Sequence, residues 1–291
     1  MTRFVGIVVH REKPEARAVA LQVISWLQSR SPAGHIDVRL DLESALRIDL
    51  PALACPCGNW GEVEFIISLG GDGTILTAAR SAAHAGIPIL GVHMGRFGFI
   101  AETHPEDLYS HLEQILDGVI QLEERLMVRA DVWRGAECIW SQTGLNDALV
   151  KSRASQLLHM RTRLAHAEFA TYPADGIIVS TPTGSTAYSL SAGGPLVAPT
   201  VKALIITPIC PHTLSARPMV VPSDEVGEIE IETDSADVVC VVDGVDPFQM
   251  ASGDRIVIRR AACVTRLIVL DHATFYRKVR DRYLYGERLN D

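Results

Sequence analysis

Short apolar runs alternate with helical patterns through the first third of the chain. The runs typical of buried strands lie at 4–9, 36–40, 65–69 and 89–93. Apolar residues recur at helical spacing after Pro14 and again from 75 to 85, and Thr103 to Glu106 predicts a capping box before a third helix. This alternation predicts an α/β N-terminal domain over residues 1–124, Rossmann-like with a parallel sheet.

A different pattern follows residue 124. Strand-like runs dominate and helical periodicity largely disappears, which predicts a β-rich C-terminal domain over residues 125–271. Near its end, 255–259 and 265–270 are expected as two strands. Residues 272–291 form a basic, aromatic tail, which we expect to be helical and to pack back on the N-terminal domain.

Length and composition limit the classes of protein that the pattern allows. With 291 residues, of which 47% are hydrophobic and 21% charged, the chain has the make-up of a folded protein of about two domains. The net charge of −8 provides no overall basic field, so we expect no nucleic-acid partner. An anionic small ligand remains compatible, because backbone N–H groups and helix N-termini bind phosphate locally.

The cysteines and the apolar stretches indicate in which cellular compartment the protein is expected. The six cysteines lack the paired CxxC spacing of a zinc site, and a chain of this length does not need disulfides, so reduced thiols are expected. The most apolar stretch, 82–100, is interrupted by His84, Pro88, His93 and Arg96 and predicts no membrane span. We therefore expect a cytoplasmic protein without a membrane partner.

The sequence Gly70-Gly71-Asp72-Gly73-Thr74 follows a predicted strand and opens a predicted helix. Its glycines let the backbone approach a ligand, and the helix start presents N–H groups to an anion, which predicts phosphate binding here. A carboxylate beside phosphates is costly unless it accepts a proton from an attacking hydroxyl or helps to hold a metal. Asp72 is therefore a candidate base, and a simple helix-capping role is the alternative.

Two other phosphate-binding patterns are absent from this sequence. There is no GxxxxGK[ST] motif and hence no P-loop lysine. The GxG of Gly71 and Gly73 is followed by Leu76 where the dinucleotide fingerprint of hydride-transfer enzymes needs a glycine.

A second region, residues 175–195, concentrates serine and threonine hydroxyls between a strand and a Gly-Gly-Pro sequence. Hydroxyl groups hydrogen bond with sugars and base edges, and Tyr188 offers a face for stacking. The alternative is a serine- and threonine-rich turn that caps itself. Asn146-Asp147, taken alone, favours a turn as well.

These motifs, together with Gly95 to Phe99 and Pro211 to Pro218, occur in the same order in the NAD kinases. The chain resembles this family over roughly residues 4–270, and is similar to the bacterial ATP/polyphosphate NAD kinases. The resemblance implies the two-domain NAD kinase architecture. The implied activity is that of a phosphotransferase with an alcohol acceptor, moving the γ-phosphoryl of ATP, or of another donor such as polyphosphate, to the adenosine ribose 2′-hydroxyl of NAD and giving NADP. It also implies Mg²⁺ or another divalent cation, and a homodimer or homotetramer.

The resemblance assigns roles to individual residues, with Asp72 as catalytic base. The residues it implies for NAD binding are Asp72, Gly73, Phe99, Asn146, Asp147, His159, Asp175, Thr186, Ala187, Tyr188, Ser189 and Ser191. Those implied for the phosphates of ATP are Gly70, Gly71, Thr74, Arg96 and His212. No metal ligand is assigned.

Three residues depart from the family pattern, and the last two of them concern the edge of the pocket. Asp147 stands where the family more often has Glu, Val245 where many members have Gln, and Pro173 where some carry a charged residue. The preference between NAD and NADH and that between ATP and polyphosphate stay open. Two other functions stay open too: a non-catalytic NAD(P)-binding sensor, and a lipid or sugar kinase that shares the Gly70 to Thr74 motif.

Overall fold

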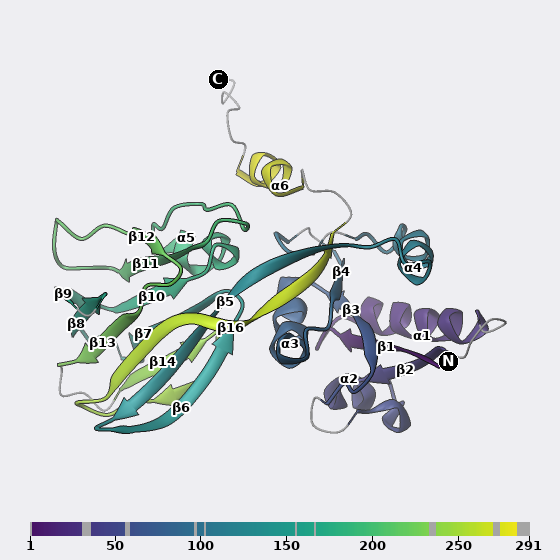
Figure 1. The fold of residues 1–291 in the computed structure, drawn as a ribbon, viewed down its shortest axis with the longest axis horizontal. Helices are drawn as coiled ribbons and strands as arrows, with labels where there is room; N and C mark the ends of the chain where they lie inside the picture. The colour runs from purple at the N-terminus through teal and green to yellow at the C-terminus, as the bar shows by residue number, and fades with distance from the viewer. Residues whose placement is uncertain are drawn as a thin grey trace. The chain divides into compact units, whose positions relative to one another are not determined.

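The computed structural model describes residues 2–30, 36–55, 59–95, 98–101, 103–154, 156–165, 167–232, 237–269 and 274–283 (Figure 1). The chain divides into two compact units. The first unit consists of Met1–Glu124 and Thr265–Asp291, and the second of Arg125–Val264. Within the described ranges, no helix is long and apolar enough to cross a membrane.

A parallel sheet forms the centre of the first unit. Its strands are β1 (Arg3–Val9), β2 (Ile36–Leu40), β3 (Val63–Gly70) and β4 (Ile89–His93), in the order β2-β1-β3-β4. The strands read as near-continuous apolar runs because a parallel sheet is covered on both faces. The core includes Val5, Ile7 and Leu69, and the prediction of an α/β domain with a parallel sheet is confirmed.

Helices and short 3₁₀ turns complete the first unit. The helices are α1 (Pro14–Ser29), α2 (Leu42–Arg47), α3 (Asp72–Ala82), α4 (Leu108–Leu116) and α6 (Thr274–Tyr283), and the 3₁₀ turns are η1 (Pro51–Leu53) and η3 (Ala83–Ala85). The α1 helix begins with proline at its first position, and it buries Ala20, Val23 and Leu27 as their spacing requires.

The predicted capping box before α4 is wrong. The helix begins at Leu108, with Asp107 at the N-cap and no side-chain cap bond. Thr103 instead continues the sheet: its N–H donates to Gly91 O at 3.1 Å, and its carbonyl accepts from His93 N at 3.0 Å. Because the backbone of Thr103 pairs with β4, Thr103 does not act as the N-cap, although Thr103 and Glu106 have the spacing of a capping box.

The second unit is built from antiparallel strands. One six-stranded sheet has the order β12-β11-β10-β7-β14-β15. Its strands are β7 (Asp147–Ser152), β10 (Gly176–Ser180), β11 (Ala203–Ile209), β12 (Met219–Pro222), β14 (Val238–Val242) and β15 (Val245–Gln249). Two short helical pieces, η4 (Thr183–Thr186) and α5 (Tyr188–Ser191), follow β10.

The other strands of this unit pair in the order β16-β13-β8-β9, and β5 pairs with both β16 and β6. They are β5 (Gln121–Arg134), β6 (Glu137–Gly144), β8 (Leu158–Leu164), β9 (Ala167–Ala174), β13 (Gly227–Ile231) and β16 (Arg255–Val269). A core of its own, which includes Val150, Ile177 and Cys240, lies in this unit. The predicted β-rich C-terminal domain is confirmed.

The end of the second unit differs from the predicted boundary at 271. The second unit ends at Val264, and the chain from Thr265 onward belongs to the first unit. The two strands expected near this point are one continuous strand, β16, whose Leu267 pairs with Ile89 of β4. Exposed Arg259 and Arg260 interrupt the apolar pattern without interrupting the backbone ladder.

Candidate functional site

Asp72 is the first residue of α3, directly after the turn that ends β3. Its side chain does not cap its own helix. Oδ2 accepts the N–H of Phe99 at 2.7 Å, and Oδ1 accepts those of Ile100 at 3.1 Å and Ala101 at 3.3 Å. The alternative of a simple helix cap is therefore wrong, because the carboxylate is held by a segment more than 25 residues further along the chain.

The glycines of the turn divide into two kinds. A Cβ at Gly70 would lie 2.0 Å from Thr74 Oγ1, so Gly70 and the buried Thr74 side chain lock the junction of strand and helix. A Cβ at Gly71 or Gly73 would have no heavy atom within 4 Å. The backbone at these two positions is open to a ligand, next to the N–H groups that a helix start leaves without intrahelical partners.

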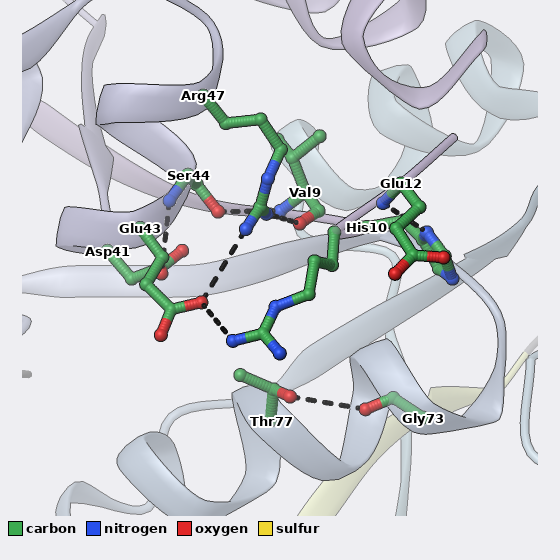
Figure 2. A network of polar contacts seen from close by, with 10 residues as sticks. Val9, His10, Glu12, Asp41, Glu43, Ser44, Arg47, Gly73 and Thr77 are labelled. Atoms are coloured by element: carbon green, nitrogen blue, oxygen red, sulfur yellow. Dashed lines mark hydrogen bonds and ion pairs between the residues drawn. The ribbon is translucent and has the colours of Figure 1, made fainter. Parts of the chain in front are cut away.

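Basic and acidic side chains form a network at the carboxyl end of β1, next to this turn (Figure 2). Arg47 donates to Val9 O at 2.6 Å, and Ser44 Oγ accepts the Val9 N–H at 2.8 Å, which ties α2 to the end of the strand. Burial and the charges of Lys13 and Arg47 lower the pKa of His10. Parallel α/β sheets bind their ligands at the carboxyl ends of the strands. At this edge the cations of Arg11 and Arg47 are paired with Glu43, at 3.6 and 3.5 Å.

In the second unit, the Asn146-Asp147 turn is organised by the carboxylate of Asp243. Oδ2 of Asp243 accepts the N–H of Leu145 at 2.8 Å, and Oδ1 accepts those of Asn146 at 2.8 Å and Asp147 at 3.2 Å. Asp243 lies at the hairpin turn between β14 and β15, with φ of 50°. The sequence analysis named Val245, two residues further on, but did not single out Asp243 and so missed this role.

Both side chains of this turn are polar; Asp147 is buried, and Asn146 is partly exposed. Asn146 Oδ1 is buried and has no hydrogen-bond partner among the described residues. Burial, and after it the charge of Asp243, raise the pKa of Asp147 to about 7. A buried acceptor without a partner costs free energy, which hydrogen-bond donors of a bound base or sugar would recover.

The hydroxyl-rich region lies beside the same turn. Thr181 donates its backbone N–H to Asn146 O at 2.8 Å and its hydroxyl to Leu145 O at 2.6 Å. Tyr188 is 41% exposed, so its ring is accessible for stacking, and Thr186, Ala187 and Ser191 belong to the same stretch. Ser189, by contrast, is fully buried: its hydroxyl bonds Thr207 Oγ1 at 2.9 Å, and its carbonyl accepts the Gly194 N–H at 2.8 Å, so it has no exposed surface to present to a ligand.

Three predicted residues lie at the opposite end of β10. Asp175 immediately precedes this strand, while the hydroxyl groups from Thr181 onward follow its last residue, and five strand residues span about 17 Å. His159 pairs with Pro173, and the His212 N–H donates to Pro173 O at 2.8 Å. The second unit therefore does not bring His159, Asp175 and His212 together with Asn146. Arg96 lies outside the described residues.

Two further features bear on the predicted site: side chains that could bind a metal, and a cavity in the second unit. Among the residues that the structure describes, no group of three or more His, Cys, Asp or Glu side chains could hold a metal ion. A pocket of about 370 Å³ in the second unit is lined by residues of 169–172 and 213–219, and contains none of the predicted site residues.

The comparisons with known proteins agree over both units. Residues 5–120 match the ATP-NAD kinase N-terminal domain and residues 145–270 the ATP-NAD kinase C-terminal domain. The chain is 42% identical to an NAD kinase of Moorella thermoacetica, over 99% of this chain and 91% of that protein. It is 40% identical to an NAD kinase of Symbiobacterium thermophilum, over 95% and 97% respectively.

Solved structures share the fold. Yeast NADH kinase complexed with NADH has a TM-score of 0.90 and 24% identity, covering 100% of this chain and 90% of the other. An NAD kinase from Archaeoglobus fulgidus in complex with ATP has a TM-score of 0.72 and 24% identity, covering 98% of each. With both family domains matched in order and curated relatives similar over nearly their full length, the chain belongs to the NAD kinase family.

Proposed function

We infer that this protein is an NAD kinase, which transfers the γ-phosphoryl of ATP to the 2′-hydroxyl of the adenosine ribose of NAD and releases NADP and ADP. Membership of the NAD kinase family supports this activity, and no comparison supports a lipid kinase or a sugar kinase. The observation that carries the chemistry is the carboxylate of Asp72, held by three backbone N–H groups beside an open glycine turn.

Asp72 is suited to receive the proton of the attacking hydroxyl. An ionised carboxylate has about four acceptor positions, and the three backbone N–H groups occupy one on Oδ2 and two on Oδ1. Oδ2 therefore keeps an acceptor position for the ribose 2′-hydroxyl. The hydroxyl oxygen bonds to the γ-phosphorus, the bond from that phosphorus to the β-phosphate oxygen breaks, and the proton passes to Asp72.

The open backbone at Gly71 and Gly73 would cradle the phosphates through the N–H groups at the start of α3. We propose that the donor binds as its Mg²⁺ complex, so that the metal enters with the substrate and offsets charge on the phosphate oxygens. Most of the rate would come from positioning, because phosphoryl transfer asks little covalent chemistry of the protein.

The second unit would recognise the nucleoside part of NAD. The unpaired Asn146 Oδ1 and the buried Asp147 offer polar partners, and Tyr188 offers a ring face. The roles of Phe99, His159, Asp175, His212 and Arg96 stay predictions from the resemblance, as do a cytoplasmic location and a homodimer or homotetramer. Light scattering on the purified protein tests the oligomeric state, and cell fractionation tests the location.

The Asp72→Asn variant tests the assignment of the base. Its amide keeps the size of the side chain and cannot take up the proton, so turnover should fall by about 10²–10⁴-fold while NAD still binds by calorimetry. Asp37→Asn, at an exposed position of β2, is the matched control and should keep normal turnover. Near-normal turnover of Asp72→Asn would show that Asp72 is not the base. Wild-type protein that binds NAD without any turnover would favour the non-catalytic sensor.

A further inference from the structure

The C-terminal helix α6 reaches the segment that holds Asp72. This segment, Gly98 to Ala101, is named the 98–101 segment below. Lys278 of α6 donates from Nζ to Phe99 O at 3.2 Å and to Ala101 O at 2.9 Å. Both bonds are charge-assisted, which makes them stronger than bonds between neutral groups.

The same two residues bond on both sides. Phe99 and Ala101 donate their N–H groups to the Asp72 carboxylate and offer their carbonyls to Lys278. The 98–101 segment is thus fixed between an anion and a cation: the Asp72 carboxylate accepts from its N–H groups, and the Lys278 ammonium donates to its carbonyls. Any shift of the carbonyls away from Lys278 also moves the N–H groups that orient Asp72.

Aromatic contacts from α6 fix the same segment through the side chain of Phe99. The Tyr283 ring stacks on Phe99 with centroids 5.9 Å apart and planes at 19°, and the Arg282 guanidinium lies 5.1 Å from the Phe99 centroid. Phe99 is 9% exposed as a result of its packing. Stacking and cation–π contacts of this kind add modest attraction, directed at one ring.

We propose that Lys278 is a positioning residue for phosphoryl transfer, acting through the 98–101 segment to hold the Asp72 carboxylate in the orientation that meets the ribose hydroxyl. The proposal rests on the proposed function, since it takes Asp72 as the base. It gives α6 a part in catalysis through its contacts with the 98–101 segment.

The test compares variants of one helix in the full-length protein. Lys278→Met removes the charge and the donors at similar length, Lys278→Arg keeps both, and Arg280→Met removes an exposed charge that pairs with Asp281 on the same helix. Steady-state kinetics for NAD and ATP give kcat and KM, and hydrogen exchange measures the protection of the amides at 99–101.

For Lys278→Met we expect kcat to fall about 10- to 100-fold with little change in either KM, because misplacement of a catalytic group by about 1 Å has effects of this size. Exchange at 99–101 should become faster. Lys278→Arg should recover most of the wild-type kcat, and Arg280→Met should match wild type. This set of results distinguishes a positioning role of Lys278 from unfolding of α6, because unfolding of the helix would lower kcat in all three variants.

Wild-type kcat in Lys278→Met overturns the proposal, and so does an equal loss of kcat in Arg280→Met. Asp72→Asn, assayed alongside, keeps the two claims apart. Loss of turnover in Asp72→Asn with normal Lys278→Met rejects only the role of Lys278. Retained turnover in Asp72→Asn rejects the base assignment itself.

Discussion

The backbone of Gly98 lies against the carboxylate of Asp72: a Cβ at residue 98 would be 2.0 Å from Oδ1 and 2.4 Å from Oδ2. Real Cβ atoms do not approach other atoms so closely, so either the carboxylate or the backbone would have to move. The absence of a side chain at Gly98 is thus a condition for the three N–H bonds that orient Asp72.

Gly98→Ala should therefore lower turnover strongly, although Gly98 has no side chain that could take part in the reaction. The methyl group displaces the carboxylate, and we expect kcat to fall by about 10²-fold or more. Gly227→Ala is the control, because its Cβ would meet neighbours only at 3.7 Å or beyond, an ordinary contact. Initial-rate kinetics of both variants check this, and a Gly98→Ala enzyme with wild-type kcat contradicts it.

Gly71→Ala and Gly73→Ala should separate folding from phosphate binding. Both Cβ atoms would enter open space, and alanine at Gly73 should favour the helix by about 0.5–1 kcal/mol, so neither variant should lose stability. If phosphates approach this backbone, turnover should fall and KM for ATP should rise. Urea unfolding and kinetics measure the two effects. If both variants are stable and have normal kinetics, the phosphates do not bind at Gly71 and Gly73.

Asp243→Asn should weaken NAD binding by loosening the Asn146-Asp147 turn. The carboxylate accepts three backbone N–H bonds with two oxygens, whereas an amide turns an NH₂ group toward one or more of these donors. We expect a loss of about 1–3 kcal/mol in stability and a higher KM for NAD. Asp246→Asn, on the exposed part of β15, should change neither. Equal values for the two variants would remove Asp243 from the account of the site.

The buried Asp147 predicts a specific pH dependence of stability. Its folded pKa is raised to about 7 from 3.8 by burial and by Asp243, so the folded state holds this proton more tightly than the unfolded state. The stability it contributes is fully present below pH 3.8 and is lost as the pH rises through about 7.

Asp147→Asn should remove this part of the slope between pH 5 and 8. Urea unfolding of wild type, Asp147→Asn and the exposed control Asp224→Asn at several pH values in that range measures it. If Asp147→Asn and wild type lose stability in parallel as the pH rises, the raised pKa of Asp147 is not what drives the loss.

The sequence predicted those parts of the molecule that local patterns encode. Buried parallel strands such as β1 and β3 are apolar runs, and the glycines after β3 mark the turn that presents Asp72. The helix α2 was missed, because six residues are too few to show helical periodicity, although Asp41 caps it with a bond to Ser44 N. The strand β8 was missed too, since exposed His159 and the partly exposed Arg161 and Arg163 break up its apolar run.

The contacts that support the site could not be predicted in this way. Lys278 meets Phe99 across 179 residues, and Asp243 meets Asn146 across 97. Neither pair leaves a local signal, since a lysine in a basic tail and an aspartate in a hairpin turn are ordinary in both places. The resemblance supplied the residues of the site, and the structure supplied what holds two of them in place.

The measurement that tests the central claim most directly is the formation of NADP from ATP, Mg²⁺ and NAD by the purified full-length chain. An NADP-specific dehydrogenase detects the product, with a no-enzyme blank and Asp72→Asn beside it. The account predicts continuous NADP formation by the wild type and a rate lower by orders of magnitude for Asp72→Asn, with NAD binding intact in both. Wild-type protein that binds NAD and forms no NADP would contradict it.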